Sequence, residues 1–252
     1  MNNEFLKGLT YNREKVVPEA LKRLYKGVLE VNGMIGLDTT SESLKELYKA
    51  LREEEVGEIF KAIDEEDPVE FLDGVIDGLV ICSYEYLLNY SRGDLYRLSF
   101  SEVGLKTELR LLRSLYRNAE ISDVLGLLEN IFYIMNIDHD KAVDEVLKSN
   151  FSKFPTFNGL ASTLASDPLF LELDGGFLGG TESVIEGQIK LIKHKGRYDD
   201  ITTTLVKDSE GFERIIFWAG IDNEKTNTKL SSPKYIKPCT FVEPDFGSCL
   251  RC

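Results

Sequence analysis

Acidic side chains in two neighbouring segments are the residues of this chain best suited to chemistry. Glu55 and Glu58 lie three residues apart, and Asp73 and Asp77 lie four apart. On a helix, each of these spacings puts both side chains on one face. If the two helices pack antiparallel, the four carboxylates can face one another, with Glu54 beside them. Carboxylates gathered in this way are suited to holding a divalent cation and to activating water.

The second acidic pair raises the question of how its charge is balanced. Its segment is apolar except for Asp73 and Asp77, and no Lys, Arg or His occurs between Lys61 and Arg92. An ionised carboxylate in an apolar site is costly unless it is paired or binds a metal. A set of carboxylate oxygens favours Mg²⁺, with Mn²⁺ as an alternative. The other interpretation is that Glu53–Glu58 is a solvated face, as charge runs usually are.

The helices that must carry these residues have recognisable beginnings. Ser43 and Glu46 form a capping box for the first helix. For the second helix, Asp67 is a suitable N-cap and Pro68 suits the first helical position. The apolar stripe of the first helix begins at Leu44, and at helical spacing it continues into the glutamates. The sequence therefore predicts that these glutamates lie on the core-facing side of the helix.

Four further helices are predicted from apolar residues at helical spacing, at residues 18–31, 101–117, 122–135 and 138–150. Together with the acidic pair of helices, they predict a mainly α protein. We expect residues 1–155 to form a helical bundle that carries the metal-binding residues.

The character of the chain changes after Pro155, where Gly, Ser and Thr become frequent. Gly175–Gly180 is expected to form a flexible loop. Two β-rich runs, at 201–207 and 212–219, flank Asp208–Gly211, and this pattern indicates a hairpin. Residues 156–252 are therefore predicted to form a β-rich insertion and a C-terminal extension that completes the site.

Composition argues against several classes of protein. The net charge of −13 disfavours a nucleic-acid-binding protein, whose surface should be basic. The chain has no apolar run of roughly 18 residues, the length that a membrane-spanning helix needs. The first residues do not resemble a signal peptide, so a cytoplasmic location is expected. Gly-x-Ser-x-Gly is absent, which disfavours a serine hydrolase. Cys249 and Cys252 form a lone CxxC, which we interpret as part of an unstructured tail rather than a zinc site.

Three motifs, in order along the chain, resemble those of a known superfamily. Glu55-x-x-Glu58, with Asp77 followed by Gly-Leu-Val-Ile, looks like the metal-binding helices of the MazG-like, all-α nucleoside triphosphate pyrophosphohydrolases. That superfamily also holds phosphoribosyl-ATP pyrophosphohydrolase and dimeric dUTPases. Residues 149–153, Ser-Asn-Phe-Ser-Lys, resemble a helix end found in many phage and bacterial members. Those members continue to a segment like residues 234–238, with a Pro-Asp shortly after.

The resemblance implies an enzyme, a Mg²⁺-dependent hydrolase of phosphoric anhydrides. Its substrate would be a nucleoside triphosphate, an NTP or a dNTP, which it would convert to the monophosphate and pyrophosphate in nucleotide-pool control. Glu55, Glu58, Asp73 and Asp77 would bind the metal, and Glu54 and Glu55 would act on the attacking water. The resemblance also implies a helical bundle that assembles as a homodimer or homotetramer.

For the substrate, the resemblance points to Asn150, Lys153, Tyr235 and Lys237. The two lysines would neutralise phosphate charge as point cations, and Asn150 would hydrogen-bond the sugar or base. Without the resemblance, Lys153 is an ordinary cation at a helix end.

The chain departs from the superfamily in its second motif, which is usually Glu-x-x-Asp. The residue three before Asp77 is Gly74, whereas Glu70 and Asp73 fit the motif literally. We favour Asp77 as the anchoring residue because an apolar run follows it. The alternative function, motivated by the charge of −13, is a non-enzymatic acidic interaction protein: a DNA mimic or a scaffold on an inactivated version of the fold. Magnesium-dependent pyrophosphate release separates the two.

Overall fold

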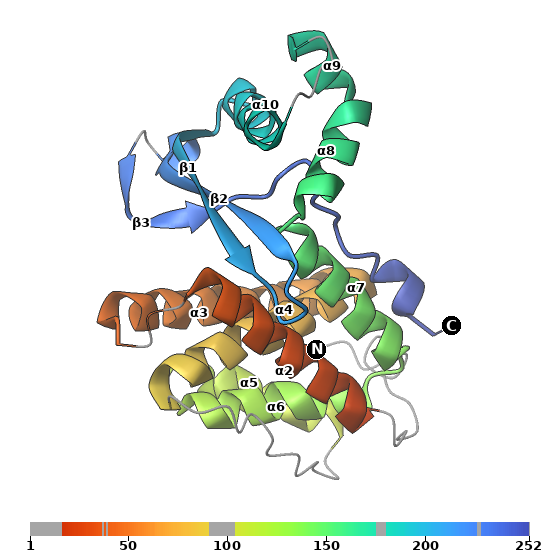
Figure 1. The fold of residues 1–252 in the computed structure, drawn as a ribbon. Coiled ribbons are helices and arrows are strands. Elements are labelled where there is room, and N and C mark those ends of the chain that lie inside the picture. The colour runs from red at the N-terminus through yellow and green to blue at the C-terminus, as the bar shows by residue number, and fades with distance from the viewer. Residues whose placement is uncertain are drawn as a thin grey trace. The chain divides into compact units, whose positions relative to one another are not determined.

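The chain folds mainly into helices, with a small three-stranded antiparallel sheet near the C-terminus (Figure 1). The computed structural model describes residues 17–36, 38, 40–90, 104–174, 180–225 and 228–251. The helices are α2 (Val17–Ile35), α3 (Glu42–Glu65), α4 (Pro68–Tyr90), α5 (Leu105–Leu115), α6 (Ile121–Ile134), α7 (His139–Ser152), α8 (Phe157–Ser166), α9 (Pro168–Asp174) and α10 (Thr181–His194). The strands are β1 (Tyr198–Lys207), β2 (Glu213–Asp222) and β3 (Thr228–Tyr235). None of the helices within these ranges combines the length and apolar character that a membrane span needs.

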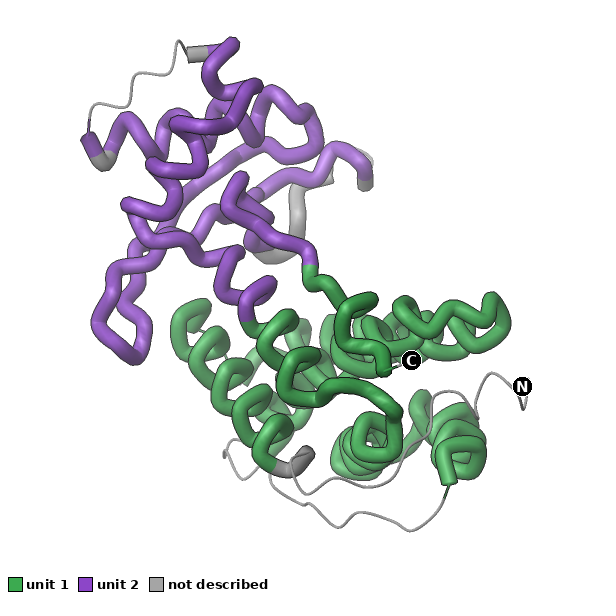
Figure 2. Tube along the Cα trace, turned by 90° about the vertical axis from the view of Figure 1, so that its right-hand side faces the viewer, with its two compact units in different colours: residues 1–147, 244–252 green, residues 148–243 purple. Residues whose placement is uncertain are grey.

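The chain folds into two compact units, which Figure 2 shows in different colours. Unit 1 comprises residues 1–147 and 244–252, and unit 2 comprises residues 148–243. The division falls within α7 rather than at the expected boundary after residue 155. The chain also returns to unit 1 for its last residues, which the sequence had grouped with the insertion.

Side chains cap the first turns of α3 and α4. The Asp67 carboxylate accepts hydrogen bonds from the backbone N–H groups of Val69 at 2.9 Å and Glu70 at 3.1 Å, which confirms the predicted N-cap of α4. The predicted capping box at Ser43 is wrong, because α3 begins two residues earlier. There the Ser41 hydroxyl accepts a hydrogen bond from the Leu44 N–H at 3.3 Å.

Only Glu66 and Asp67 separate α3 from α4. Glu66 adopts the left-handed conformation, with φ 58°, and its N–H donates to the carbonyl of Ala62. A helix that ends in this way reverses the chain at once. The two long helices therefore lie antiparallel and side by side.

The face of α3 that is buried differs from the predicted stripe. Its buried residues are Tyr48, Arg52, Val56, Ile59, Phe60, Ala62 and Ile63. Leu47, a member of the predicted stripe, has 45 % of its surface exposed. Glu54 and Glu58 are exposed, and Glu55 is half-buried. The prediction that the glutamates lie on the core-facing side is therefore wrong: Glu55 lies at the edge of that side, next to Val56.

The first part of the predicted β-rich insertion is helical and forms α8, α9 and α10. The Thr156 hydroxyl caps α8 by accepting from the Gly159 N–H at 3.2 Å. The Asp167 carboxylate caps α9 by accepting from the Leu169 N–H at 2.9 Å. These hydroxyl and carboxyl residues stabilise helix starts, which explains why composition alone gave the wrong prediction. Residues 175–179 of the predicted flexible loop lie outside the described residues.

The predicted hairpin is confirmed. Strands β1 and β2 pair antiparallel, and β3 pairs with the other edge of β2. In the turn, Gly211 has φ 86°, and the Asp208 carboxylate accepts from the N–H groups of Glu210 and Phe212. Apolar residues of α8, α9 and α10 pack with those of β2 and with Ile236; the buried ones are Leu160, Leu164, Phe170, Val184, Leu191, Ile192, Ile215, Phe217, Ala219 and Ile236.

The last described residues of the chain are ordered within unit 1, so the prediction of an unstructured tail at the CxxC is wrong for residues 249–251. Gly247–Cys249 forms a 3-10 turn, and Cys249 is fully buried. The Asp138 N–H donates to the carbonyl of Cys249 at 2.8 Å, and the Arg251 N–H donates to the carbonyl of Asn136 at 3.3 Å. The tail therefore braces the beginning of α7. Cys252 lies outside the described residues.

Candidate functional site

A close approach between α3 and α4 positions the acidic residues. A Cβ added to Gly74 would lie 3.1 Å from Ile59 Cγ1 and 3.2 Å from the Ile59 backbone nitrogen. A Cβ added to Gly78 would lie 3.4 Å from Leu128 Cδ1. Glycine at these two positions lets α4 pack tightly against its neighbours. One helical turn from this contact lie Glu55 on α3 and Asp77 on α4.

Glu55 carries the clearest electrostatic signature of the site. Its side chain is half-buried, and its pKa is raised to about 8. Burial is the largest cause, followed by the negative charges of Asp77, Glu58, Glu54 and Asp73, in that order. Desolvation and like charges both disfavour an ionised carboxylate. The five acidic residues singled out by the sequence thus lie near enough to act on one another.

The order of these charge effects helps to decide which residues of α4 belong to the acidic motif, Asp77 or the pair Glu70 and Asp73. Asp77 acts most strongly on Glu55, and Asp73 acts least within the set. Glu70 is exposed and is not among the residues that raise this pKa. A glutamate in place of Gly74 would meet the Ile59 backbone, which gives a packing reason for the departure from Glu-x-x-Asp. The geometry therefore favours Asp77 over Glu70.

The acidic residues of α3 and α4 are of the type that binds a divalent cation, but their side chains are too far apart to hold one. All the donors are carboxylate oxygens, the ligands that Mg²⁺ and Mn²⁺ take. Within the described ranges, no three His, Cys, Asp or Glu side chains stand together closely enough to hold a metal ion. Without a cation between them, the negatively charged carboxylates repel one another. Side-chain rotations on fixed helices would have to bring the ligands together.

The predicted substrate-binding residues lie in unit 2, whereas the acidic residues lie in unit 1. The Lys153 ammonium donates to Asn150 Oδ1 at 2.8 Å. It also lies 5.8 Å from the centre of the Phe241 ring, and the Lys237 ammonium lies 3.9 Å from the same centre. Unit 2 therefore brings the two lysines to one aromatic ring, with Asn150 attached to one of them.

Tyr235 and Lys237 also have structural partners. The Tyr235 ring packs 5.7 Å from that of Phe154 and 6.4 Å from that of Trp218. Lys237 forms an ion pair with Glu243 at 3.3 Å. Tyr235 therefore helps to hold β3 against the segment that follows α7. The charge of Lys237 is partly balanced by an exposed carboxylate.

Sequence reasoning missed a buried ion pair between α3 and α4. Arg52 is 2 % exposed and Glu85 is 5 % exposed, and Arg52 Nη1 lies 3.2 Å from Glu85 Oε1. Burial raises the pKa of Glu85, and the charges of Arg52 and Lys49 partly offset that rise. The sequence signal was a glutamate within the long apolar run of α4. The segment between Lys61 and Arg92 holds no cation, and the partner of Glu85 lies on the preceding helix.

Compared with models of protein families, with characterised proteins and with solved structures, the chain gives no match.

Proposed function

We propose that the chain is a Mg²⁺-dependent nucleoside triphosphate pyrophosphohydrolase of the MazG-like, all-α type. The observation that supports this most directly is the electrostatic coupling of Glu55 to Asp77, Glu58 and Asp73 across α3 and α4. A half-buried carboxyl whose pKa is raised to about 8, first by burial and then by its acidic neighbours, is a costly arrangement in the absence of a cation. A divalent cation would remove that cost.

In this proposal, Glu55, Glu58, Asp73 and Asp77 hold Mg²⁺, or Mn²⁺ in its place. The metal would supply Lewis acidity toward the phosphate oxygens and would lower the pKa of a bound water. Glu55 would have to be ionised to act as a ligand, because a carboxylate binds a metal in its charged form. Glu54 is exposed beside the set and is suited to orienting the attacking water or accepting its proton.

Unit 2 would contribute to recognition of the substrate. Lys153 and Lys237 place two ammonium groups at the Phe241 ring. Positive charge of this kind attracts a triphosphate toward a protein whose net charge is −13. Asn150 is suited to a hydrogen bond with sugar or base, and Tyr235 would hold the segment in place. The helical unit would assemble as a homodimer or homotetramer.

The proposal is tested by a screen of all common NTPs and dNTPs for pyrophosphate release, with Mg²⁺ and with EDTA. We expect Mg²⁺-dependent formation of monophosphate and pyrophosphate from at least one nucleotide. Glu46→Gln is a matched control, since Glu46 is an exposed glutamate on the same helix. Its activity should equal that of the wild type. A chain that releases no pyrophosphate from any nucleotide would favour the acidic interaction protein instead.

A further inference from the structure

A second site in unit 1 is built from residues that the proposed function does not use. A cavity of about 290 Å³ is lined by Lys49 and Arg52 from α3, by Glu85 and Asn89 from α4, and by residues 117–121, between α5 and α6. Neither the four proposed metal ligands nor Glu54 line it. The volume is near the lower end of the range for small-molecule sites.

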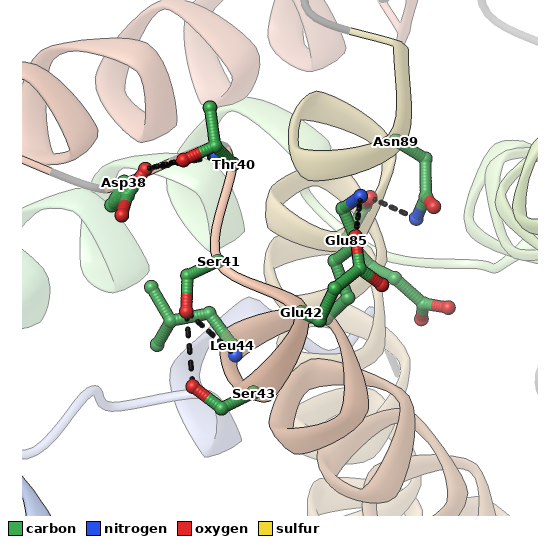
Figure 3. Close-up of polar contacts among 9 residues, drawn as sticks. Asp38, Thr40, Ser41, Glu42, Ser43, Leu44, Glu85 and Asn89 are labelled. Carbon is green, nitrogen blue, oxygen red and sulfur yellow. Dashed lines mark hydrogen bonds and ion pairs between the residues drawn. The ribbon is translucent and has the colours of Figure 1, made fainter.

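Two buried polar atoms in this lining have no hydrogen-bond partner. They are Arg52 Nε and Glu85 Oε2, the atoms left over from the buried ion pair. An unpaired buried donor on a charged group is costly and is normally satisfied by water or a ligand. Asn89 is already engaged, because its amide donates to the Glu85 carbonyl at 2.8 Å (Figure 3). The unpartnered donor among these lining residues is therefore Arg52 Nε.

The N-terminus of α6 opens into the same cavity. Residues 118–121 line it, and the N-cap residue Glu120 makes no side-chain hydrogen bond to the first turn. The first N–H groups of a helix and its dipole favour an anion. Lys49 and Arg117 are two further cationic side chains in the lining, and Arg117 Nε lies 3.9 Å from Glu53 Oε2. Cations in the lining thus outnumber the acidic residues, Glu85 and Glu120.

A neighbouring cavity extends the site toward apolar surface. Its volume is about 440 Å³, and it shares Arg117 and Asn118 with the first. The rings of Phe60 and Tyr116 line it. The guanidinium of Arg113 lies 4.7 Å from the centre of the Phe60 ring, and that of Arg117 lies 5.2 Å from the centre of the Tyr116 ring. An aromatic or apolar group of a ligand bound at Arg52 and Arg117 can therefore lie in the second cavity, beside these stacked side chains.

We propose that these adjoining cavities bind a small organic phosphate, with its phosphate group at Arg52, Lys49, Arg117 and the N-terminus of α6. The planar guanidinium groups suit phosphate oxygens. The bound phosphate links α3, α4 and α6, so that it also stabilises unit 1 against unfolding.

The test is calorimetric titration of the full chain at constant ionic strength, without divalent cations, so that the proposed metal site takes no part. The probes are phenyl phosphate, inorganic phosphate and benzoate. We expect saturable binding of phenyl phosphate, weaker binding of inorganic phosphate and the weakest binding of benzoate. Equal binding of the two phosphates would mean that the free ion is the ligand, which still supports the phosphate site. Binding of neither phosphate would overturn the proposal.

Variants locate the binding without disturbing the buried pair. Lys49→Gln and Arg117→Gln each remove an exposed cation from the lining, and each should weaken phenyl phosphate binding about tenfold. Lys61→Gln is the matched control, an exposed lysine of α3 that pairs with Glu65 and does not line the cavity. Unchanged affinity in both lining variants, or an equal loss in the control, would show that the phosphate binds elsewhere.

Discussion

Gly74 on α4 lies against the backbone of Ile59 on α3, where an added Cβ would come within 3.2 Å of the Ile59 nitrogen. This relationship sets which face of α3 is buried. It also sets the position of Glu55 and Asp77, which lie one turn away on each helix.

We expect Gly74→Ala to lower the free energy of unfolding by about 1–3 kcal/mol, because the extra methyl group overpacks the contact. Urea denaturation measures this. Gly126→Ala is the control, since a Cβ there has nothing within 4 Å. The gain in helix propensity should make that variant about 0.5–1 kcal/mol more stable. If Gly74→Ala were as stable as the Gly126 variant, the close approach of the two helices would be wrong.

The acidic set should destabilise the metal-free protein. Asp77 and Glu58 are the two carboxylates that act most strongly on Glu55. We expect Glu58→Gln and Asp77→Asn to be at least as stable as the wild type in EDTA, because each removes a like charge. Thermal unfolding in EDTA measures this. A clear loss of stability in both variants would mean that these residues support the fold rather than a metal.

The Arg52–Glu85 pair should behave as a buried ion pair. Arg52→Met leaves Glu85 buried and unpaired, so we expect a loss of about 3–5 kcal/mol in the free energy of unfolding. Arg52→Met combined with Glu85→Leu removes both charges and should recover most of that loss. A double-mutant cycle by urea denaturation gives the coupling energy. If the losses of stability in the two single variants added up to the loss in the double variant, the pairing of Arg52 with Glu85 would be contradicted.

Glu129 should make stability depend on pH. It is 4 % exposed and accepts a hydrogen bond from Tyr25. Burial raises its pKa to about 7, against the opposing effect of the Tyr25 hydroxyl. Because the folded pKa lies above the unfolded one, the folded chain binds the proton more tightly. Its stabilising contribution is complete below about pH 4.5, the unfolded pKa, and is lost as pH rises toward 7.

The pKa shift of Glu129 corresponds to a change of about 3 kcal/mol in the free energy of unfolding across this pH range. Glu129→Gln should remove it, so that the free energy of unfolding falls less steeply between pH 4.5 and 7.5 than in the wild type. Tyr25→Phe removes the hydrogen bond that favours the charged form, so it should raise the pKa of Glu129 and steepen the dependence. Equal pH slopes in the wild type and Glu129→Gln would count against this assignment.

Local signals in the sequence predicted local structure well. The N-cap at Asp67 and the hairpin at Asp208–Gly211 each depend on a few adjacent residues, and both are confirmed. The first helix of unit 2 was missed, although Thr156 before Leu160 and Leu164 was an available signal. There, high Gly, Ser and Thr content was given more weight than helical spacing.

Relationships between helices could not be read from the sequence in the same way. The grouping of Glu55 with Asp77 was predicted, but the buried side of α3 was not, because it depends on where Gly74 meets Ile59. The pairing of Arg52 with Glu85 likewise depends on the antiparallel packing of two helices. Spacing along one helix carries no information on such a contact.

The central claim is that the carboxylates of α3 and α4 hold a divalent cation. The most direct measurement is titration with Mn²⁺, with the free ion followed by electron paramagnetic resonance, for the wild type, Glu58→Gln, Asp77→Asn and the control Glu46→Gln. We expect saturable binding by the wild type and the control, weakened at least tenfold in the other two variants. Equal Mn²⁺ binding by all four proteins, or none by the wild type, would contradict the claim.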